Sequence, residues 1–140
     1  MELREEKRNL FTVEDDYYLA HCISTDCAMG KGIAVEFEKR FNLRDNLLEY
    51  VKEEREHPTC ILEGKVFNLI TKEKYWHKPT YATLEGSLIA MKNIVENEGI
   101  KKIAMPRIGS GLDKLRWDVV IGLIEKTFED LDVEILICYI

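Results

Sequence analysis

Two glycine-rich segments carry backbone groups suited to binding an anion. The first reads Cys-Ala-Met-Gly-Lys-Gly-Ile-Ala over residues 27–34, and the second reads Met-Pro-Arg-Ile-Gly-Ser-Gly-Leu-Asp over residues 105–113. Glycine lets the backbone approach an anion closely, and free N–H groups at the start of a helix favour a phosphate. The first segment matches neither the P-loop nor the GxGxxG spacing, and a plain turn before a helix is its alternative interpretation. Together, the two segments fit a ligand with two linked phosphates better than either one alone.

The residues around these segments have the periodicity of strands that alternate with helices. Residues 17–23 form an apolar run typical of a central strand, and the apolar positions over 33–41 predict a helix that begins just after the glycines. Further strands are predicted over 59–62, 65–71, 103–105 and 133–139, and further helices over 42–55, from about 80 to 99, and over 117–131. This order predicts an α/β fold, a three-layer α/β/α arrangement with a central mixed sheet, in one domain that spans residues 1–140.

Three polar residues follow strands of the predicted sheet. Ser24, Lys72 and Arg107 each come at or just after the end of a strand. In open α/β sheets, ligands bind in the crevice outside the carboxyl ends of the strands. We therefore expect these residues and both glycine-rich segments to line one crevice.

Composition and charge restrict the class of protein. The 140 residues are 46% hydrophobic and 33% charged, which is the balance of a soluble globular protein. No segment has the apolar core of a signal peptide or the length to span a bilayer, so we expect an intracellular, cytoplasmic protein without a membrane partner. A net charge of −6 argues against general nucleic-acid binding and favours a small ligand. The four cysteines have neither redox nor zinc-ribbon spacing, so we interpret them as reduced, mostly buried thiols and expect no metal site.

Five strings of residues carry a family resemblance. They are LAHCIS (19–24), AMGKGIA (28–34), LITK (69–72), HKPTY (77–81) and MPRIGSGLDKLRW (105–117). In these strings the chain resembles the macrodomain family and, within it, the class of the terminal ADP-ribose protein glycohydrolase, to which bacterial DNA ADP-ribosyl glycohydrolase antitoxins are also similar. The resemblance runs from about Asn9 to the C-terminus. It implies a three-layer macrodomain whose crevice binds ADP-ribose, with both glycine-rich segments around the diphosphate.

The resemblance also implies roles for individual residues. In the family, the lysine of the LITK string attacks the anomeric carbon of the distal ribose, and the aspartate of the GLD string completes the reaction; these residues are Lys72 and Asp113 here. No cofactor is implied, and we expect a monomer. The candidate ligand-binding residues are Asn9, Leu10, His21, Ser24, Met29, Gly30, Lys31, Gly32, Ile33, Ala34, Pro106, Arg107, Ile108, Gly109, Ser110, Gly111, Leu112, Tyr139 and Ile140.

The chemistry implied for Lys72 agrees with elementary principles. An amine is a nucleophile only when it is neutral, and burial or a second cation helps it to lose its proton. Lys31, Lys74 and Arg107 are candidates for that cation. Asp113 can act as a general base toward a hydroxyl or water, or can stabilise positive charge on the sugar.

Plainer interpretations exist for several of these residues. Lys72 can be a solvated surface lysine, and Asp113 can cap the turn before the following helix. His21 lies in an apolar strand and fits a core histidine as well as a ligand contact. Trp76 can stack on a substrate base or simply cover its loop. Asn9 stands where many macrodomains carry an aspartate that contacts adenine, so it can accept a hydrogen bond but has no charge.

These observations lead to one expected function and two alternatives. We expect a hydrolase that removes mono-ADP-ribose from glutamate or aspartate side chains of proteins and that hydrolyses O-acetyl-ADP-ribose. One alternative is removal of ADP-ribose from nucleic acid, against which the net charge argues mildly. The other is a reader that only binds ADP-ribose, against which the presence of both Lys72 and Asp113 argues. A zinc-dependent macrodomain is disfavoured because no Cys and His ligands cluster around the first glycine-rich segment.

Overall fold

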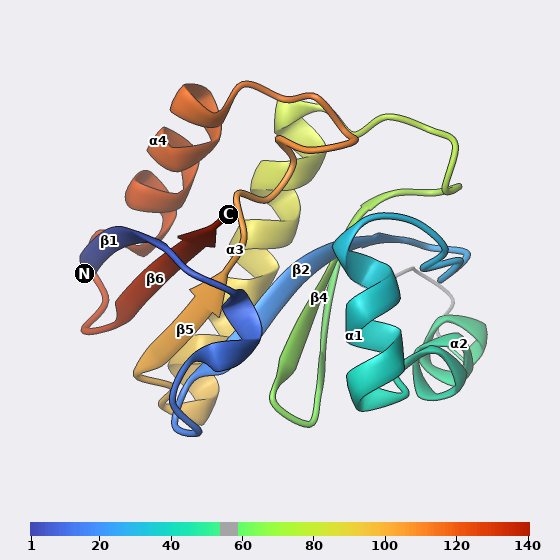
Figure 1. Cartoon of the computed structure of the whole chain (residues 1–140), viewed down its shortest axis with the longest axis horizontal. Helices are drawn as coiled ribbons and strands as arrows, with labels where there is room; N and C mark the ends of the chain where they lie inside the picture. The colour runs from blue at the N-terminus through green and yellow to red at the C-terminus, as the bar shows by residue number, and fades with distance from the viewer. Residues whose placement is uncertain (54–58) are drawn as a thin grey trace.

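A mixed sheet with helices on both faces forms the centre of the molecule (Figure 1). The computed structural model describes residues 1–53 and 59–140, and over these the sheet has six strands in the order β1-β6-β5-β2-β4-β3. All neighbouring strands are parallel except β3 and β4, which form an antiparallel hairpin. The strands are β1 (Glu2–Lys7), β2 (Tyr18–Ser24), β3 (Cys60–Glu63), β4 (Val66–Lys72), β5 (Lys102–Met105) and β6 (Glu134–Tyr139). The predicted α/β fold with a mixed sheet is therefore confirmed.

The helices divide between the two faces of the sheet. In Figure 1, α1 (Ile33–Phe41) and α2 (Arg44–Glu53) lie on one side, and α3 (Tyr81–Glu98) and α4 (Trp117–Phe128) lie on the other. A short 3-10 helix, Leu10–Thr12, follows β1. Over the residues that the structure describes, no helix combines the length and the apolar character needed to cross a membrane. The three layers predicted from the alternation of strands and helices are present.

The hydrophobic core consists of one cluster on each face of the sheet. Strand β4 is buried on both faces: Phe67 and Leu69 belong to the cluster with α3 and α4, whereas Val66 and Ile70 belong to the cluster with α1 and α2. A strand covered on both sides needs such a continuous apolar run, which is why the period of two is absent there. Burying each large apolar side chain stabilises the fold by about 1.5–3 kcal/mol.

Local signals determine where the helices next to the crevice begin and end. Thr80 and Thr83 form a reciprocal capping box at the start of α3, and Gly99 ends the helix in the left-handed conformation. Asn42, at φ = 50°, ends α1 in the same way, so α2 begins at Arg44 rather than at residue 42 as predicted. Helix α4 ends at Phe128, three residues earlier than predicted. The predicted end of the second helix at Arg55 lies outside the described residues.

The periodicity analysis missed strand β1. Its burial alternates weakly, and four of its six residues are exposed, because it is an edge strand that pairs only with β6. Leu3 alone packs against the core, while Arg4 makes ion pairs with Glu6 and Glu134. Charged side chains are common on edge strands because they discourage pairing with other chains. Because most positions of this strand are charged, no apolar pattern marks it in the sequence.

Candidate active site

Three loops meet at the carboxyl edge of the sheet, as predicted. Ser24 is the last residue of β2, Lys72 is the last residue of β4, and Arg107 follows β5 by two positions. These strands are adjacent and parallel, so their ends lie at one edge. Ser24 and Lys72 are direct partners in the strand register, next to an irregularity between Ile23 and Ser24. The backbone of the β2–α1 loop therefore begins beside the lysine.

Lys72 and Asp113 form a partly buried ion pair. The Nζ atom of Lys72 lies 2.8 Å from Oδ1 of Asp113, and the two side chains are only 15% and 16% exposed. Lys72 is thus not a solvated surface lysine. The capping interpretation of Asp113 is also wrong, because Arg116 occupies the N-cap of α4 and no side chain caps that helix in the described part of the chain.

Arg107 is held by residues of β1, β6 and α4. Its Nε donates to Oε1 of Glu5 at 3.2 Å, and its guanidinium lies 4.2 Å from the centre of the Tyr139 ring. The indole nitrogen of Trp117 donates to the same Glu5 oxygen at 3.1 Å. These contacts tie Arg107 to β1 and β6, so they do not support its expected role as a cation beside Lys72.

The first glycine-rich segment leads directly into α1. Gly32 is the N-cap at φ = 62° and has no side chain to satisfy the first N–H groups of the helix. Cys27 and Met29 also adopt left-handed backbone conformations, and both side chains are buried. Of the other candidate residues here, Gly30, Lys31 and Ile33 are exposed and Ala34 is half-buried. The segment therefore presents backbone and a helix N-terminus, an arrangement that can bind an anion.

The two glycine-rich segments touch one another. A Cβ atom on Gly32 would lie 3.3 Å from Cδ1 of Leu112, whose side chain is 60% exposed. Gly109 has φ = 73°, Ile108 is buried, Pro106 and Ser110 are half-buried, and Gly111 is exposed. The structure thus brings together the two segments that sequence spacing placed at separate strand ends.

Two residues of the HKPTY string hold the second glycine-rich segment. The Nζ of Lys78 donates to the carbonyl oxygen of Leu112 at 2.8 Å, and the backbone N–H of Arg116 donates to the Tyr81 hydroxyl at 3.1 Å. No role was predicted for Lys78 or Tyr81. Only the family resemblance of the HKPTY string could have indicated a role for these residues. No local periodicity points to contacts with residues more than 30 positions away.

Asp26 is a further residue for which no role was predicted. Its carboxylate accepts hydrogen bonds from the Ser24 hydroxyl, from the backbone N–H of Ala28 at 3.3 Å and from that of Tyr75 at 3.1 Å. Partial burial raises the pKa of Asp26, but these hydrogen bonds outweigh it, and the net pKa lies below its ordinary value. Asp26 therefore links the β2–α1 loop to the β4–α3 loop as a charged group.

His21 lies in the core, where its contacts are with protein. The side chain is fully buried and stacks on Phe37 with ring centres 3.9 Å apart, and Nε2 lies 2.6 Å from Oδ1 of Asn68. Burial lowers the pKa of His21 to about 4, against which the Asn68 hydrogen bond acts only weakly, so the ring is neutral at pH 7. Among the described residues no group pairs with its Nδ1. The structure thus favours the core interpretation over a ligand contact for this residue.

The candidate residues that follow β1 and those at the end of β6 differ in exposure. Asn9 is exposed, and its Oδ1 accepts from the N–H of Phe11 at 2.9 Å as the cap of the 3-10 helix. Leu10 is buried, whereas Ile140 is 97% exposed. Since one lone pair of Asn9 is used by the cap, a ligand has the second one available. Tyr139 is half-buried beneath the Arg107 guanidinium.

Two aromatic side chains project from the loop that follows Lys72. Tyr75 is 53% exposed and Trp76 is 63% exposed, and their rings meet edge to face at 5.1 Å. The Trp76 ring also meets the His77 ring at 5.5 Å, so the indole packs on two neighbours in its own loop while most of its surface stays exposed. Both interpretations, stacking on a substrate base and covering the loop, are compatible with this arrangement.

The cysteines are free thiols with little tendency to ionise. All four lie in the described part of the chain; Cys27, Cys60 and Cys138 are buried and Cys22 is half-buried. Burial raises the pKa of Cys22 and of Cys60 to about 12. Within residues 1–53 and 59–140, no group of three or more Cys, His, Asp and Glu side chains could hold a metal ion.

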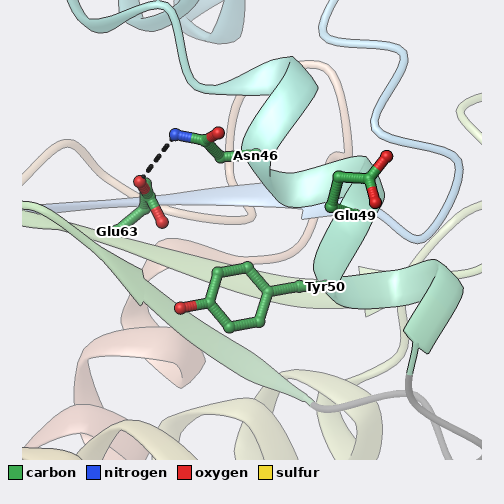
Figure 2. A pocket seen from close by; sticks show the side chains of 4 residues that line it. All are labelled: Asn46, Glu49, Tyr50 and Glu63. Atoms are coloured by element: carbon green, nitrogen blue, oxygen red, sulfur yellow. Dashed lines mark hydrogen bonds between the residues drawn. The ribbon is translucent and has the colours of Figure 1, made fainter.

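Two surface hollows lie beside α2. Figure 2 shows one between α2 and β3, lined by Asn46, Glu49, Tyr50 and Glu63, with a hydrogen bond of 2.9 Å from Asn46 to Glu63. None of these is a predicted site residue. A larger one borders the crevice and is lined by Thr25, Asp26, Leu48, Glu49, Val51, Lys52, Glu73 and Lys74.

Solved structures with the same architecture include macrodomains. The macrodomain of Mycobacterium tuberculosis DarG superposes with a TM-score of 0.88 over 99% of this chain and 97% of that one, at 21% identity. The structure of Thermosipho africanus DarTG in complex with ADP-ribose gives a TM-score of 0.84 over 99% of this chain and 42% of that one, at 20% identity. At such identities the likeness establishes the fold alone.

The sequence relatives define the family more closely. No protein-family model matches the chain. The human protein named ADP-ribose glycohydrolase OARD1 is 44% identical over 132 residues, which cover 94% of this chain and 87% of the human protein. The bovine protein of the same name is 43% identical over the same shares. The chain belongs to the macrodomain family, in the class of the terminal ADP-ribose protein glycohydrolases.

Proposed function

We propose that the chain is an ADP-ribosyl hydrolase that removes mono-ADP-ribose from glutamate and aspartate esters and hydrolyses O-acetyl-ADP-ribose. The observation that carries the proposal is the 2.8 Å pair of Lys72 and Asp113 at the edge where the glycine-rich loops meet. The ligand and the reaction are supported by similarity to the human ADP-ribose glycohydrolase and to the structure of DarTG in complex with ADP-ribose. In this proposal residues 1–140 act as one domain, as a monomer and without a cofactor.

Backbone groups bind the diphosphate in this proposal. The N-terminus of α1 behind Gly32 offers unsatisfied N–H groups, and the loop from Ile108 to Leu112 lies against it. Helix N-termini attract anions through these groups and through the helix dipole. Because neutral backbone supplies the attraction, a net charge of −6 on the chain is compatible with an anionic ligand.

The ion pair supplies both the nucleophile and its base. Lys72 first transfers a proton to Asp113, the closest acceptor at 2.8 Å, and becomes a neutral amine. The amine nitrogen then bonds to the anomeric carbon of the distal ribose, while the bond from that carbon to the ester oxygen breaks and the side-chain carboxylate leaves with the electron pair. Placing both groups before the substrate arrives removes part of the entropic barrier.

Water completes the reaction at the same carbon. Asp113, once it has released its proton to solvent, takes a proton from water as the water oxygen bonds to the anomeric carbon. The carbon–nitrogen bond breaks, which returns Lys72 and releases ADP-ribose. For O-acetyl-ADP-ribose, the same carboxylate activates water at the acetyl carbonyl and releases acetate.

The test compares release and binding in three variants. ADP-ribose release from a glutamate-modified protein is measured for the native chain, Lys72→Ala, Asp113→Ala and the control Lys126→Ala, with calorimetric binding of ADP-ribose alongside. Lys126 is 73% exposed and pairs with Glu85 on α3, away from the crevice. We expect release to be lost in the two site variants while binding persists. Binding without release by the native chain would leave a reader as the better account.

A second candidate is hydrolysis of ADP-ribose linked to nucleic acid. The exposed Tyr75 and Trp76, flanked by Lys74 and Lys78, favour it, because aromatic rings stack on bases and lysines attract phosphates. Trp76→Ala should then slow release from an ADP-ribosylated oligonucleotide and leave release from a glutamate-modified protein unchanged. Tyr50→Ala, on α2 and 45% exposed, is the matched control.

A further inference from the structure

The Asp26 carboxylate determines which way the Ser24 hydroxyl points its proton. Oδ1 of Asp26 accepts from the Ser24 hydroxyl and from the N–H of Ala28 at 3.3 Å, and Oδ2 accepts from the N–H of Tyr75 at 3.1 Å. All three partners act as donors, and two of them are backbone N–H groups that cannot reverse. A carboxylate surrounded in this way is stabilised in its ionised form, which has no proton to donate.

The Ser24 hydroxyl has only one proton, and it donates that proton in a hydrogen bond to the Asp26 carboxylate. Once that proton points at Asp26, the Ser24 oxygen can offer a ligand only its lone pairs. Ser24 can then accept a hydrogen bond from a ligand hydroxyl. It cannot donate one to a phosphate oxygen, which itself has only lone pairs.

The place of Ser24 in the sheet indicates which ligand hydroxyl it meets. Ser24 pairs with Lys72 in the β2–β4 register, and the next N–H, that of Thr25, donates to the carbonyl oxygen of Lys72 at 2.9 Å. In the proposed function, the Lys72 amine reaches the anomeric carbon of the distal ribose. We therefore expect the ligand groups nearest to Ser24 to be hydroxyls of that same ribose.

We propose that Asp26 is a positioning residue that turns Ser24 into a dedicated acceptor for a hydroxyl of the distal ribose. The inference rests on the proposed function, since it needs ADP-ribose as the ligand. It assigns to Ser24 a preference for the sugar over the phosphates. It also assigns to Asp26 a role that the sequence does not reveal.

The measurement is the ratio of the dissociation constants of ADP and ADP-ribose, obtained by calorimetry. This ratio isolates what the distal ribose contributes to affinity, because both ligands carry the same adenosine diphosphate. Ser24→Ala should lower the ratio about threefold to tenfold, the value of one hydrogen bond, and should leave ADP binding unchanged. Asp26→Asn should lower this ratio too. An asparagine side chain has one oxygen for the three donors that the carboxylate binds, so the Ser24 proton is free to turn away.

The double variant separates positioning from a merely structural effect. If Asp26 acts through Ser24, Asp26→Asn combined with Ser24→Ala lowers the ratio no further than Ser24→Ala alone. A structural role would instead weaken ADP and ADP-ribose equally, so Asp26→Asn alone would leave the ratio unchanged. Asp130→Asn is the control, because Asp130 is 66% exposed and pairs with Lys92 at 3.0 Å outside the crevice.

The outcomes distinguish this inference from the proposed function. A native chain that binds neither ligand overturns both. A native chain that binds ADP-ribose, with an unchanged ratio in Ser24→Ala, overturns only the inference. Ser24→Ala keeps both backbone contacts of Asp26, so it decides the case if Asp26→Asn is too unstable to purify.

Discussion

The ammonium group of Lys78 lies 2.8 Å from the carbonyl oxygen of Leu112, one residue before Asp113. This contact holds the loop that carries Asp113 against the loop that follows Lys72. Lys78→Ala should therefore lower kcat by about 10-fold to 100-fold, because displacing a reacting group by an ångström has that effect. Kinetics of ADP-ribose release test this, with Lys126→Ala as the control. A native kcat in Lys78→Ala would show that Lys72 alone positions Asp113.

Gly32 is required where α1 begins, because its φ of 62° is unfavourable for other residues and a Cβ would approach Cδ1 of Leu112 to 3.3 Å. Gly32→Ala should destabilise the fold by about 1–2 kcal/mol and weaken ADP-ribose binding. Gly122→Ala is the matched control: Gly122 lies within α4, where a Cβ would meet nothing within 4 Å, so alanine there should stabilise the fold by about 0.5–1 kcal/mol. Thermal unfolding and calorimetry measure both effects. Equal stability changes in the two variants would contradict the argument.

The elements that position the site could largely be predicted from the sequence. The predicted apolar run over 17–23 matches β2 (Tyr18–Ser24) within one residue at each end, and the predicted helix over 33–41 is α1. Gly64 turns the β3–β4 hairpin at φ = 59°, as the short connection indicated. These features are local: they depend on periodicity and on glycine, both of which can be seen within a few residues.

The contacts within the site could not be predicted in this way. Asp26 reaches Tyr75, 49 positions away, and Lys78 reaches Leu112, 34 positions away. Both bonds join loops from different strands, so they depend on the sheet order rather than on any local pattern. Arg107 illustrates the same point, because its partner Glu5 lies on the strand that the periodicity analysis missed.

The buried thiols should resist modification in the folded protein. Burial raises the pKa of Cys60 to about 12 and that of Cys27 to about 11, so at pH 8 about one thiol in ten thousand at Cys60 is ionised. An aromatic disulfide reagent should react slowly with the native chain. After unfolding in urea, all four thiols should react rapidly. Rapid labelling of Cys27 or Cys60 at pH 8, located by mass spectrometry, would contradict the burial argument.

His21 should make the stability of the fold depend on pH below neutrality. Its pKa is about 4 in the folded chain and 6.5 as the ordinary value, so between these pH values the unfolded chain binds a proton that the folded chain does not. Stability is therefore full above pH 6.5 and falls as the pH is lowered toward 4. The loss attributable to His21 reaches about 3 kcal/mol, from the difference between the two pKa values.

A comparison of the native chain with His21→Gln isolates this effect from that of the carboxylates. Glutamine does not titrate and can still donate to Asn68, the partner of His21 at 2.6 Å. Urea unfolding of both proteins at pH 7 and pH 4.5 gives the free energies. Asp26, whose pKa is lowered in the folded chain, also loses stability as the pH falls, but it does so in both proteins. The native chain should lose about 2–3 kcal/mol more than the variant between these pH values, and equal losses would mean that the buried imidazole is protonated without unfolding.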